Sequence, residues 1–295
     1  MGKKQLCPGR PNSALKTGSA VIGGRQKKRS FRQEGWFRMN WQIKKTAEMP
    51  QLSNPLLIEG LPGIGNVGKI AVDFMIEELD AKKVYEITSH SLPHSVFVNE
   101  DNLVELPKIT IYYKKTRNRD LLFLTGDVQP IDEKASYEFC EAILDLAQKH
   151  NSKEIITLAG IGLPNIPKKL KIYCTGNSKT AIKRFISGTM IQKNLYGVVG
   201  PIVGVSGLLL GLAHNRNINA ISLLAETYGH PMYLGIRGSR EIVNILNSKL
   251  GLKIDIKELD NEVKEIEQEI DSKKTRPGPI SKLRTKLGKD TSYIG

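Results

Sequence analysis

A glycine-rich turn is the feature of this sequence that comes nearest to a known binding chemistry. It lies in residues 57–74, LIEGLPGIGNVGKIAVDF, between an apolar run and a helical pattern. Its glycines, in G-x-G-x-x-G spacing, are Gly63, Gly65 and Gly68. Such turns hold phosphates on backbone amides, and Lys69 nearly completes a P-loop, although Ile70 stands where a magnesium-binding Ser or Thr is required. The spacing predicts an anion- or nucleotide-binding turn at 60–69 or, alternatively, a tight strand-to-helix connection.

Other polar residues that could complete a nucleotide site or an active site are scattered. A dinucleotide fold needs an acidic residue at the end of its second strand, whereas Glu86 falls near the middle of that segment. Asp127 and Gln129, in TGDVQPID, follow an apolar strand, where α/β proteins gather active-site groups. Asp127 is there either a general base or a partner for local amides. His230, in ETYGHPMYLG, is a candidate to cap or line a cleft.

Two further patterns fall short of known chemistry. His90 and His94 are four residues apart, but Pro93 lies between them in an extended segment, so they do not share a helical face as paired metal ligands would. Ser206 lies in GVSGL, where Leu208 replaces the second glycine of a nucleophile elbow. Because these residues do not make up a complete catalytic group, we expect a protein that is not an enzyme, with no catalytic residue, no metal site and no cofactor.

Short apolar segments alternate with amphipathic helical segments from residue 55 onward. Strands are expected at PLLIEG, KKVYEITSHS, LLFLTGD, EIITLAG and NAISLLAETYG, and helices at about 66–79, 132–150 and 239–250. Between residues 90 and 115 the segments SVFVNE, LVELP and ITIYYKK are rich in β-formers and predict an inserted hairpin. The pattern predicts an α/β fold, a mostly parallel mixed sheet flanked by helices, with a β-hairpin insertion and a C-terminal helix.

The formal charge of +14 is concentrated at the N-terminus. Residues 1–48 hold twelve Lys or Arg against two Glu, which gives 12 − 2 = +10 and leaves 14 − 10 = +4 for the rest. With no apolar periodicity, residues 1–48 are predicted to be a disordered basic extension. Met39 is an alternative start of translation. A nucleic-acid-binding arm is less favoured, because no known binding module is recognisable there.

The remaining chain divides into three predicted parts. Residues 49–254 are expected to form the α/β domain, 255–272 a helix, and 273–295 a flexible basic tail interrupted by two prolines. Apolar residues recur in the helix at spacings of four, three and four: Leu259, Val263, Ile266 and Ile270. This seam predicts either a helix docked on its own domain or a self-association helix.

Cysteine usage and hydropathy indicate the cellular setting. Cys7, Cys140 and Cys174 lie far apart without a C-x-x-C pair, so neither a disulfide framework nor a zinc site is predicted. The longest apolar stretch, 198–213, is broken by glycines and is shorter than the ~20 residues of a membrane helix. We expect a cytoplasmic protein with no membrane partner.

Four segments in order resemble the proteasome assembly chaperone 2 family in its archaeal form, whose members are sometimes labelled ATP-grasp-like. They are LIEGLPGIGNVGKIAVDFMIEEL, LTGDVQPID with SYEFCEAILDLAQKH, IITLAGIG, and SLLAETYGHP, within residues 52–270. The resemblance implies a phosphorylase- or hydrolase-like α/β fold and self-association into a homo-oligomer or pairing with a paralogous chaperone. It also implies proteasome α-subunits, or the finished core particle, as partners.

The resemblance also gives the C-terminus a role. Relatives that dock on the α-ring use a C-terminal hydrophobic-Tyr-any motif. Here the chain ends in Tyr293, Ile294 and Gly295, so the tyrosine is shifted by one position and follows Ser292 in place of an apolar residue. These three residues are the predicted partner-binding element. The leading hypothesis is a proteasome assembly chaperone or core-particle-binding factor; the alternative is a nucleotide-binding protein or enzyme that uses the glycine turn.

Overall fold

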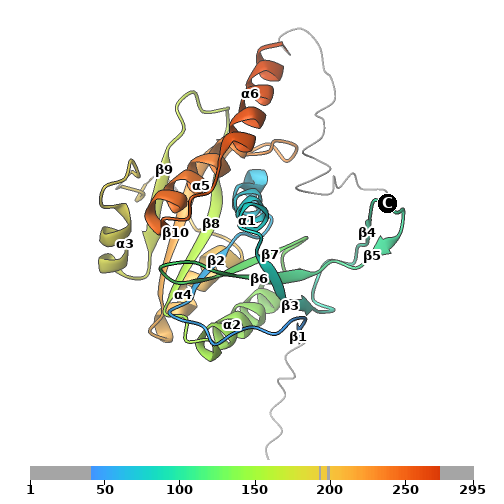
Figure 1. The fold of residues 1–295 in the computed structure, drawn as a ribbon. Helices are drawn as coiled ribbons and strands as arrows, with labels where there is room; N and C mark the ends of the chain where they lie inside the picture. The colour runs from blue at the N-terminus through green and yellow to red at the C-terminus, as the bar shows by residue number, and fades with distance from the viewer. Residues whose placement is uncertain (1–40, 193, 198–199, 273–295) are drawn as a thin grey trace, which may run out of the picture. The chain divides into compact units, whose positions relative to one another are not determined.

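A mixed sheet of eight strands forms the centre of the fold (Figure 1). The computed structural model describes residues 41–192, 194–197 and 200–272, with side chains described up to residue 264, all within the compact unit Met39–Gly295. In sheet order the strands are β1 (Gln42–Lys45), β3 (Lys82–Thr88), β6 (Ile109–Lys115), β7 (Asp120–Gly126), β2 (Leu56–Glu59), β8 (Glu154–Leu163), β10 (Asn219–Tyr228) and β9 (Ile172–Gly176). The strands β7, β2, β8 and β10 pair in parallel, while β1, β6 and β9 run in the opposite direction.

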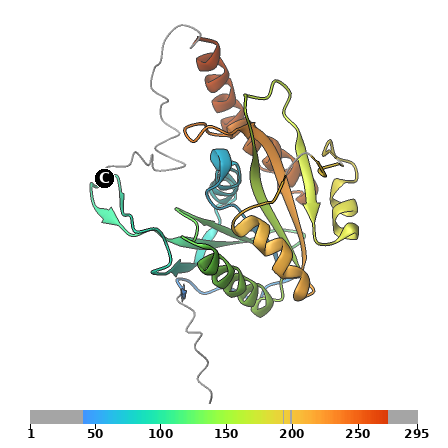
Figure 2. The same cartoon turned by 180° about the vertical axis from the view of Figure 1, so that it is seen from behind.

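Helices cover both faces of this sheet (Figures 1 and 2). They are α1 (Val67–Glu78), α2 (Glu133–Lys149), α3 (Lys179–Ile186), α4 (Val205–Asn215), α5 (Ile236–Leu250) and α6 (Lys257–Ser272), with a short 3-10 turn at Ile64–Asn66 before α1. The helices α2 and α4 share one buried cluster with Leu57 of β2. The helices α1, α3, α5 and α6 share another cluster with Leu56 and Ile58. Successive residues of β2 are thus buried in two different cores, as expected for a central strand covered by helices on both faces. The predicted α/β class is confirmed.

The sheet begins earlier in the chain than the sequence predicted. Residues 41–48 belong to the predicted disordered extension, yet β1 pairs antiparallel with β3, placing Gln42 opposite Thr88. Trp41 is buried and its ring lies 4.7 Å from that of Phe139 in α2. A single aromatic residue in a basic stretch has no periodicity, so only its tertiary contacts identify it as part of the core.

A separate two-stranded sheet forms the predicted insertion between β3 and β6. It consists of β4 (Phe97–Val98) and β5 (Val104–Glu105), joined by a turn in which Asn99 Oδ1 accepts hydrogen bonds from the amides of Asp101 and Leu103. The hairpin extends away from the sheet in both views (Figures 1 and 2). Five apolar side chains on or beside the hairpin are more than half exposed: Val96, Val98, Leu103, Val104 and Leu106.

The C-terminal helix docks on its own domain through its first half. Leu259 is buried in the cluster shared with α5, and Val263 packs against the same cluster. Arg240 of α5 donates from Nε to Asp260 at 2.7 Å. The side chains of Ile266 and Ile270 lie outside the described part, so the seam beyond Val263 stays a prediction. Within the described ranges no helix is long and apolar enough to cross a membrane.

Candidate functional site

The glycine turn lies where β2 ends, at the carboxyl edge of the parallel strands. The chain leaves β2 at Glu59 and passes through the 3-10 turn into α1. Gly65 has φ +62° and Asn66 φ +50°, both in the left-handed region that glycine and asparagine adopt most readily. This double left-handed step reverses the chain within a few residues, which explains why the sequence carries Gly and Asn here.

Close packing accounts for most of the glycines in this region. A Cβ at Gly68 would lie 2.0 Å from the Leu158 carbonyl oxygen of β8, and a Cβ at Gly65 would lie 2.9 Å from Oγ1 of Thr227. Gly63 differs, because its nearest contact to a Cβ would be 4.0 Å away. Two of the three motif glycines therefore allow the turn and α1 to lie directly on β8 and β10.

Several polar groups of the turn are already used within the protein. The Gly63 amide donates to Oδ1 of Asn66 at 3.3 Å, and the Gly65 carbonyl accepts from the Gly235 amide at 2.7 Å. Lys69 does not turn back toward the loop: its Nζ lies 2.7 Å from Oδ2 of Asp73, one turn further along α1. An anion that binds in this turn would have to replace these hydrogen bonds and this ion pair with contacts to itself. The nucleotide interpretation stays a prediction.

Gln129 is the one distant candidate that reaches the turn. Its Nε2 donates to the Pro62 carbonyl at 2.5 Å, and its Oε1 accepts from the Val205 amide at 3.1 Å. The Gln129 side chain thus joins the turn to the first residue of α4. It gives a partner to the Val205 backbone amide, which has none within the helix because it lies at the helix start.

Asp127 and His230 serve local contacts. Oδ2 of Asp127 accepts from the Lys108 amide at 3.2 Å, which joins the start of β6 to the end of β7, away from the connection between these strands. Nδ1 of His230 accepts from the Met232 amide at 3.2 Å, and its ring stacks on that of Tyr228 with centroids 5.6 Å apart. The structure therefore does not bring Asp127, Gln129 and His230 together as one constellation. His230 caps its own loop after β10.

Glu59 is a buried acidic residue that the sequence analysis did not single out. It is completely buried at the end of β2, where Oε1 accepts from the Leu61 amide at 3.1 Å and Oε2 from the Ser206 hydroxyl at 2.9 Å. Burial raises the pKa of this carboxyl to about 7, since the two hydrogen bonds offset only part of the desolvation. The feature of the sequence that could have identified Glu59 is a charged residue directly after the apolar residues Leu56, Leu57 and Ile58.

The remaining predicted groups offer no metal site in the described part of the chain. Among described residues, no cluster of three or more His, Cys, Asp or Glu side chains could hold a metal ion. Cys140 and Cys174 are buried free thiols, and burial raises the pKa of Cys174 to about 12. Cys7 and the predicted partner-binding residues Tyr293, Ile294 and Gly295 lie outside the described residues.

The fold and the packed carboxyl edge define an α/β protein with a parallel centre, and comparisons with known proteins identify its family. The model described as PAC2 family matches residues 57–274, so the chain belongs to the PAC2 family, which confirms the resemblance seen in its sequence.

Several relatives match most of the chain. The crystal structure of Pyrococcus furiosus PbaB, an archaeal proteasome activator, is similar with a TM-score of 0.73 and 33% identity, covering 80% of this chain and 99% of that one. Pyrococcus furiosus PbaA, an archaeal homolog of proteasome-assembly chaperone, is 27% identical with a TM-score of 0.64, covering 79% and 91%. The uncharacterized protein MJ1210 of Methanocaldococcus jannaschii is 26% identical over 255 residues, 85% of this chain and 96% of that protein.

Glu59 should make the folded state less stable as the pH rises. Because its pKa is about 7 when folded and 4.5 ordinarily, the folded protein holds a proton that the unfolded chain releases. This stabilisation is fully present below pH 4.5 and is lost as the pH rises through about 7, a change of roughly 3 kcal/mol. Glu59→Gln should flatten the profile, measured as urea unfolding free energy between pH 4 and 8.

The control for this experiment is Glu100→Gln, which changes an exposed carboxyl on the hairpin turn and should keep the parental profile. A Glu59→Gln variant that loses stability with rising pH as steeply as the parent would contradict the assignment.

The packing role of Gly68 can be tested against a second helical glycine. Gly68→Ala should lower the unfolding free energy by about 1–3 kcal/mol, because its Cβ collides with the rigid backbone of β8. Gly211→Ala, in α4, has no atom within 4 Å of the added Cβ and should raise stability by about 0.5–1 kcal/mol. Thermal and urea unfolding measure both. Equal unfolding free energies of the two variants would contradict the packing role of Gly68. Loss of ATP binding in a folded Gly68→Ala variant would also count against it, because that result would favour the nucleotide interpretation.

Proposed function

We propose that this protein is a proteasome assembly chaperone or core-particle-binding factor that acts in the cytoplasm through protein–protein contacts with α-subunits. The observation that carries the proposal is the similarity to PbaB, an archaeal proteasome activator, over 80% of this chain at 33% identity. The similarity to PbaA, a homolog of proteasome-assembly chaperone, supports the same role. At the carboxyl edge of the sheet, Gly63, Gln129 and Glu59 are engaged in internal hydrogen bonds, which supports a binding role over catalysis.

The C-terminus is the proposed anchor. The first half of α6 is fixed on α5 by Leu259, Val263 and the ion pair between Arg240 and Asp260. The helix then continues beyond the end of α5 in both views (Figures 1 and 2). The chain has 295 − 272 = 23 further residues after Ser272, ending in Tyr293, Ile294 and Gly295.

Removing the anchor should weaken the complex with α-subunits. Deletion of residues 293–295, or Tyr293→Ala, should reduce binding at least tenfold, as loss of a buried aromatic at an interface typically does. Native mass spectrometry of the full chain mixed with α-subunits from its own source measures the complex. Tyr196→Ala is the matched control, because it removes a fully exposed tyrosine from the body of the protein.

Two outcomes would contradict this arrangement. Undiminished binding after the deletion would place the interface on the globular domain and overturn the role of the tail. Absence of any complex with the unaltered chain, at concentrations where both partners are folded, would overturn the proposed partner itself.

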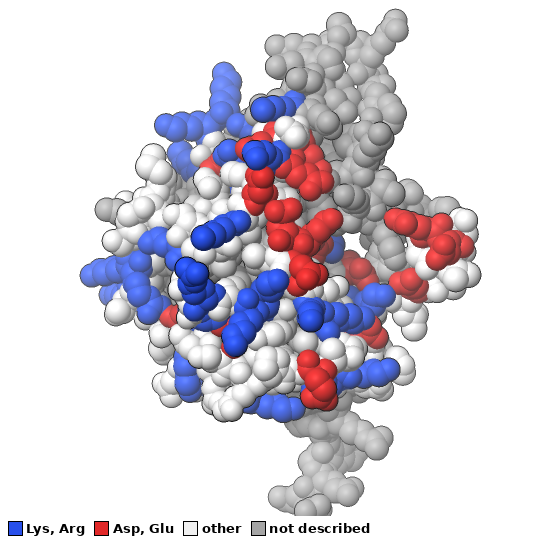
Figure 3. All heavy atoms as spheres, in the orientation of Figure 1, with Lys and Arg blue, Asp and Glu red and all other residues white. Residues whose placement is uncertain are grey.

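For self-association, the hairpin β4–β5 is the surface we propose to contact a second copy of this chain. Its five exposed apolar side chains have no covering element within the described residues, and one of them, Leu106, is 74% exposed. Exposed patches of this kind mark interaction sites. Acidic side chains gather on the hairpin, while basic ones spread over much of the same face of the body (Figure 3), which makes a second copy complementary in charge.

A charge placed in the hairpin should therefore prevent association. Val104→Asp should shift the protein from an oligomer to a single chain, because an unpaired carboxylate would be buried in the contact. Size-exclusion chromatography with light scattering measures the mass. Val203→Asp changes another exposed valine, before α4, and should leave the mass unchanged. A monomeric parent, or an oligomer that survives Val104→Asp, would contradict the assignment.

A further inference from the structure

A second polar site lies at the opposite edge of the parallel strands from the glycine turn. A pocket of about 450 Å³ opens where β2, β8 and β10 begin, beside α3 and the end of α5. Its floor includes the first residues of those three strands, Leu56, Glu154 and Asn219, which are direct neighbours in the sheet. A pocket of this volume is in the range that holds small molecules.

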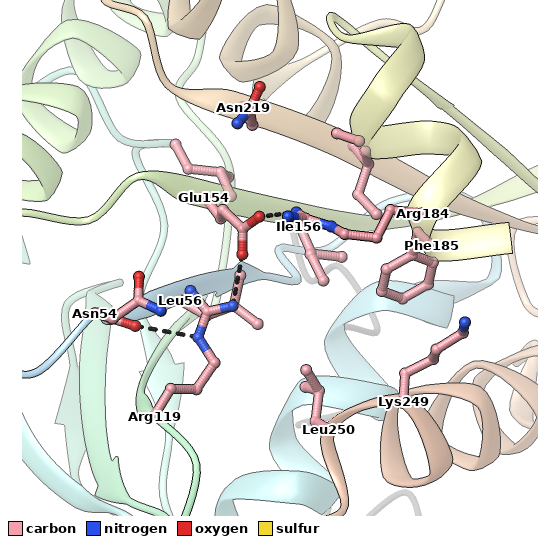
Figure 4. A pocket seen from close by; sticks show the side chains of 13 residues that line it. Asn54, Leu56, Arg119, Glu154, Ile156, Arg184, Phe185, Asn219, Lys249 and Leu250 are labelled. Carbon is pink, nitrogen blue, oxygen red and sulfur yellow. Dashed lines mark hydrogen bonds and ion pairs between the residues drawn. The ribbon is translucent and has the colours of Figure 1, made fainter. Parts of the chain in front are cut away.

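Two arginines meet at the single carboxylate of the pocket. Arg119 donates from Nη1 to Oε2 of Glu154 at 2.6 Å, and Arg184 of α3 reaches Oε1 of the same residue. Figure 4 shows the two guanidinium groups approaching Glu154 from different sides. One carboxylate therefore serves two cations, so the arrangement keeps a surplus positive charge.

Arg119 is held in place with unused hydrogen-bonding capacity. Its side chain is only 14% exposed, its Nε donates to the Asn54 carbonyl at 3.1 Å, and its Nη2 has no partner among the described residues. Burial lowers the pKa of this guanidinium, which means that the charged form lacks stabilisation it would have in water. Because Nη2 is itself buried, an anion in the pocket would supply that stabilisation through the positive charge, which is delocalised over the whole guanidinium group.

The other side of the pocket is apolar with one more cation. Phe185 and Leu250 line it across from Asn54 (Figure 4). Nζ of Lys249 lies 5.9 Å from the centre of the Phe185 ring and also donates to the Ser187 carbonyl at the end of α3. The lining thus holds three cations and one carboxylate. Arg184 and Lys249 lie in the last turns of α3 and α5, where the partial negative charge of a helix carboxyl end favours cations and offsets part of their charge.

We propose that this pocket binds a small organic anion, with its carboxylate or phosphate group against Arg119 and Arg184 and its apolar part against Phe185 and Leu250. The two guanidinium groups present planar donors suited to either oxyanion. The aromatic ring and the leucine provide a surface for a ring or short hydrocarbon. This ligand site lies at the amino edge of the strands and is independent of the proposed proteasome contacts.

The test uses the full chain and three probes: phenyl phosphate, 3-phenylpropionate and inorganic phosphate. We expect isothermal titration calorimetry to show binding of at least one of the two aromatic anions, and the stronger of them identifies the preferred oxyanion. Inorganic phosphate should bind more weakly, because it lacks the apolar part. Arg184→Ala should weaken binding about tenfold or more, since it removes one charge-assisted contact from a side chain that is 67% exposed.

Two further variants make the result specific. Lys183→Ala removes a charge from the neighbouring, exposed position of α3 that does not line the pocket, and it should leave affinity unchanged. Glu154→Gln should tighten binding several-fold, because both arginines then lose their competing carboxylate. Failure of both aromatic anions to bind the unaltered chain would overturn the proposal. Equal weakening by Lys183→Ala and Arg184→Ala would also overturn it, because it would show non-specific attraction.

Discussion

The rest of the structure depends on how closely the backbone of the glycine turn approaches the parallel strands. A Cβ at Gly68 would come within 2.0 Å of the Leu158 carbonyl, and a Cβ at Gly160 within 2.3 Å of the Ile64 carbonyl. The turn and β8 therefore fit together only because both sides lack side chains at these points. That contact sets where α1 begins, and α1 in turn brings Val67 and Met75 into the core beneath α5. The turn most directly builds the fold.

The two edges of the parallel strands differ as a result. At the carboxyl edge, the turn, Gln129 and the buried Glu59 form hydrogen bonds that tie β2, α1 and α4 to one another. Other α/β proteins place ligands at this edge, whereas here several of the chain's own groups bind one another. At the amino edge, a pocket lined by arginines opens to solvent beside α3.

Much of the fold could be predicted from the sequence, because apolar periodicity and helix signals are local. Asp132 accepts from the Ala135 amide as the N-cap of α2, which begins where the helix at 132–150 is predicted, and Ser178 caps α3. The start of the domain could not be predicted, since Trp41 joins the core through contacts with a distant helix. Likewise, the arginine pocket unites residues 119, 154 and 184, which no motif links in sequence. The glycine motif was recognisable, but only the structure shows what its glycines contact.

We propose that this member of the PAC2 family works by binding proteasome α-subunits. Sedimentation velocity of the full chain mixed with α-subunits from its own source tests this proposal. Binding should produce a new, faster-sedimenting species that contains both proteins and grows with added chain until one partner is exhausted. Independent sedimentation of the two proteins over the same concentrations would contradict it.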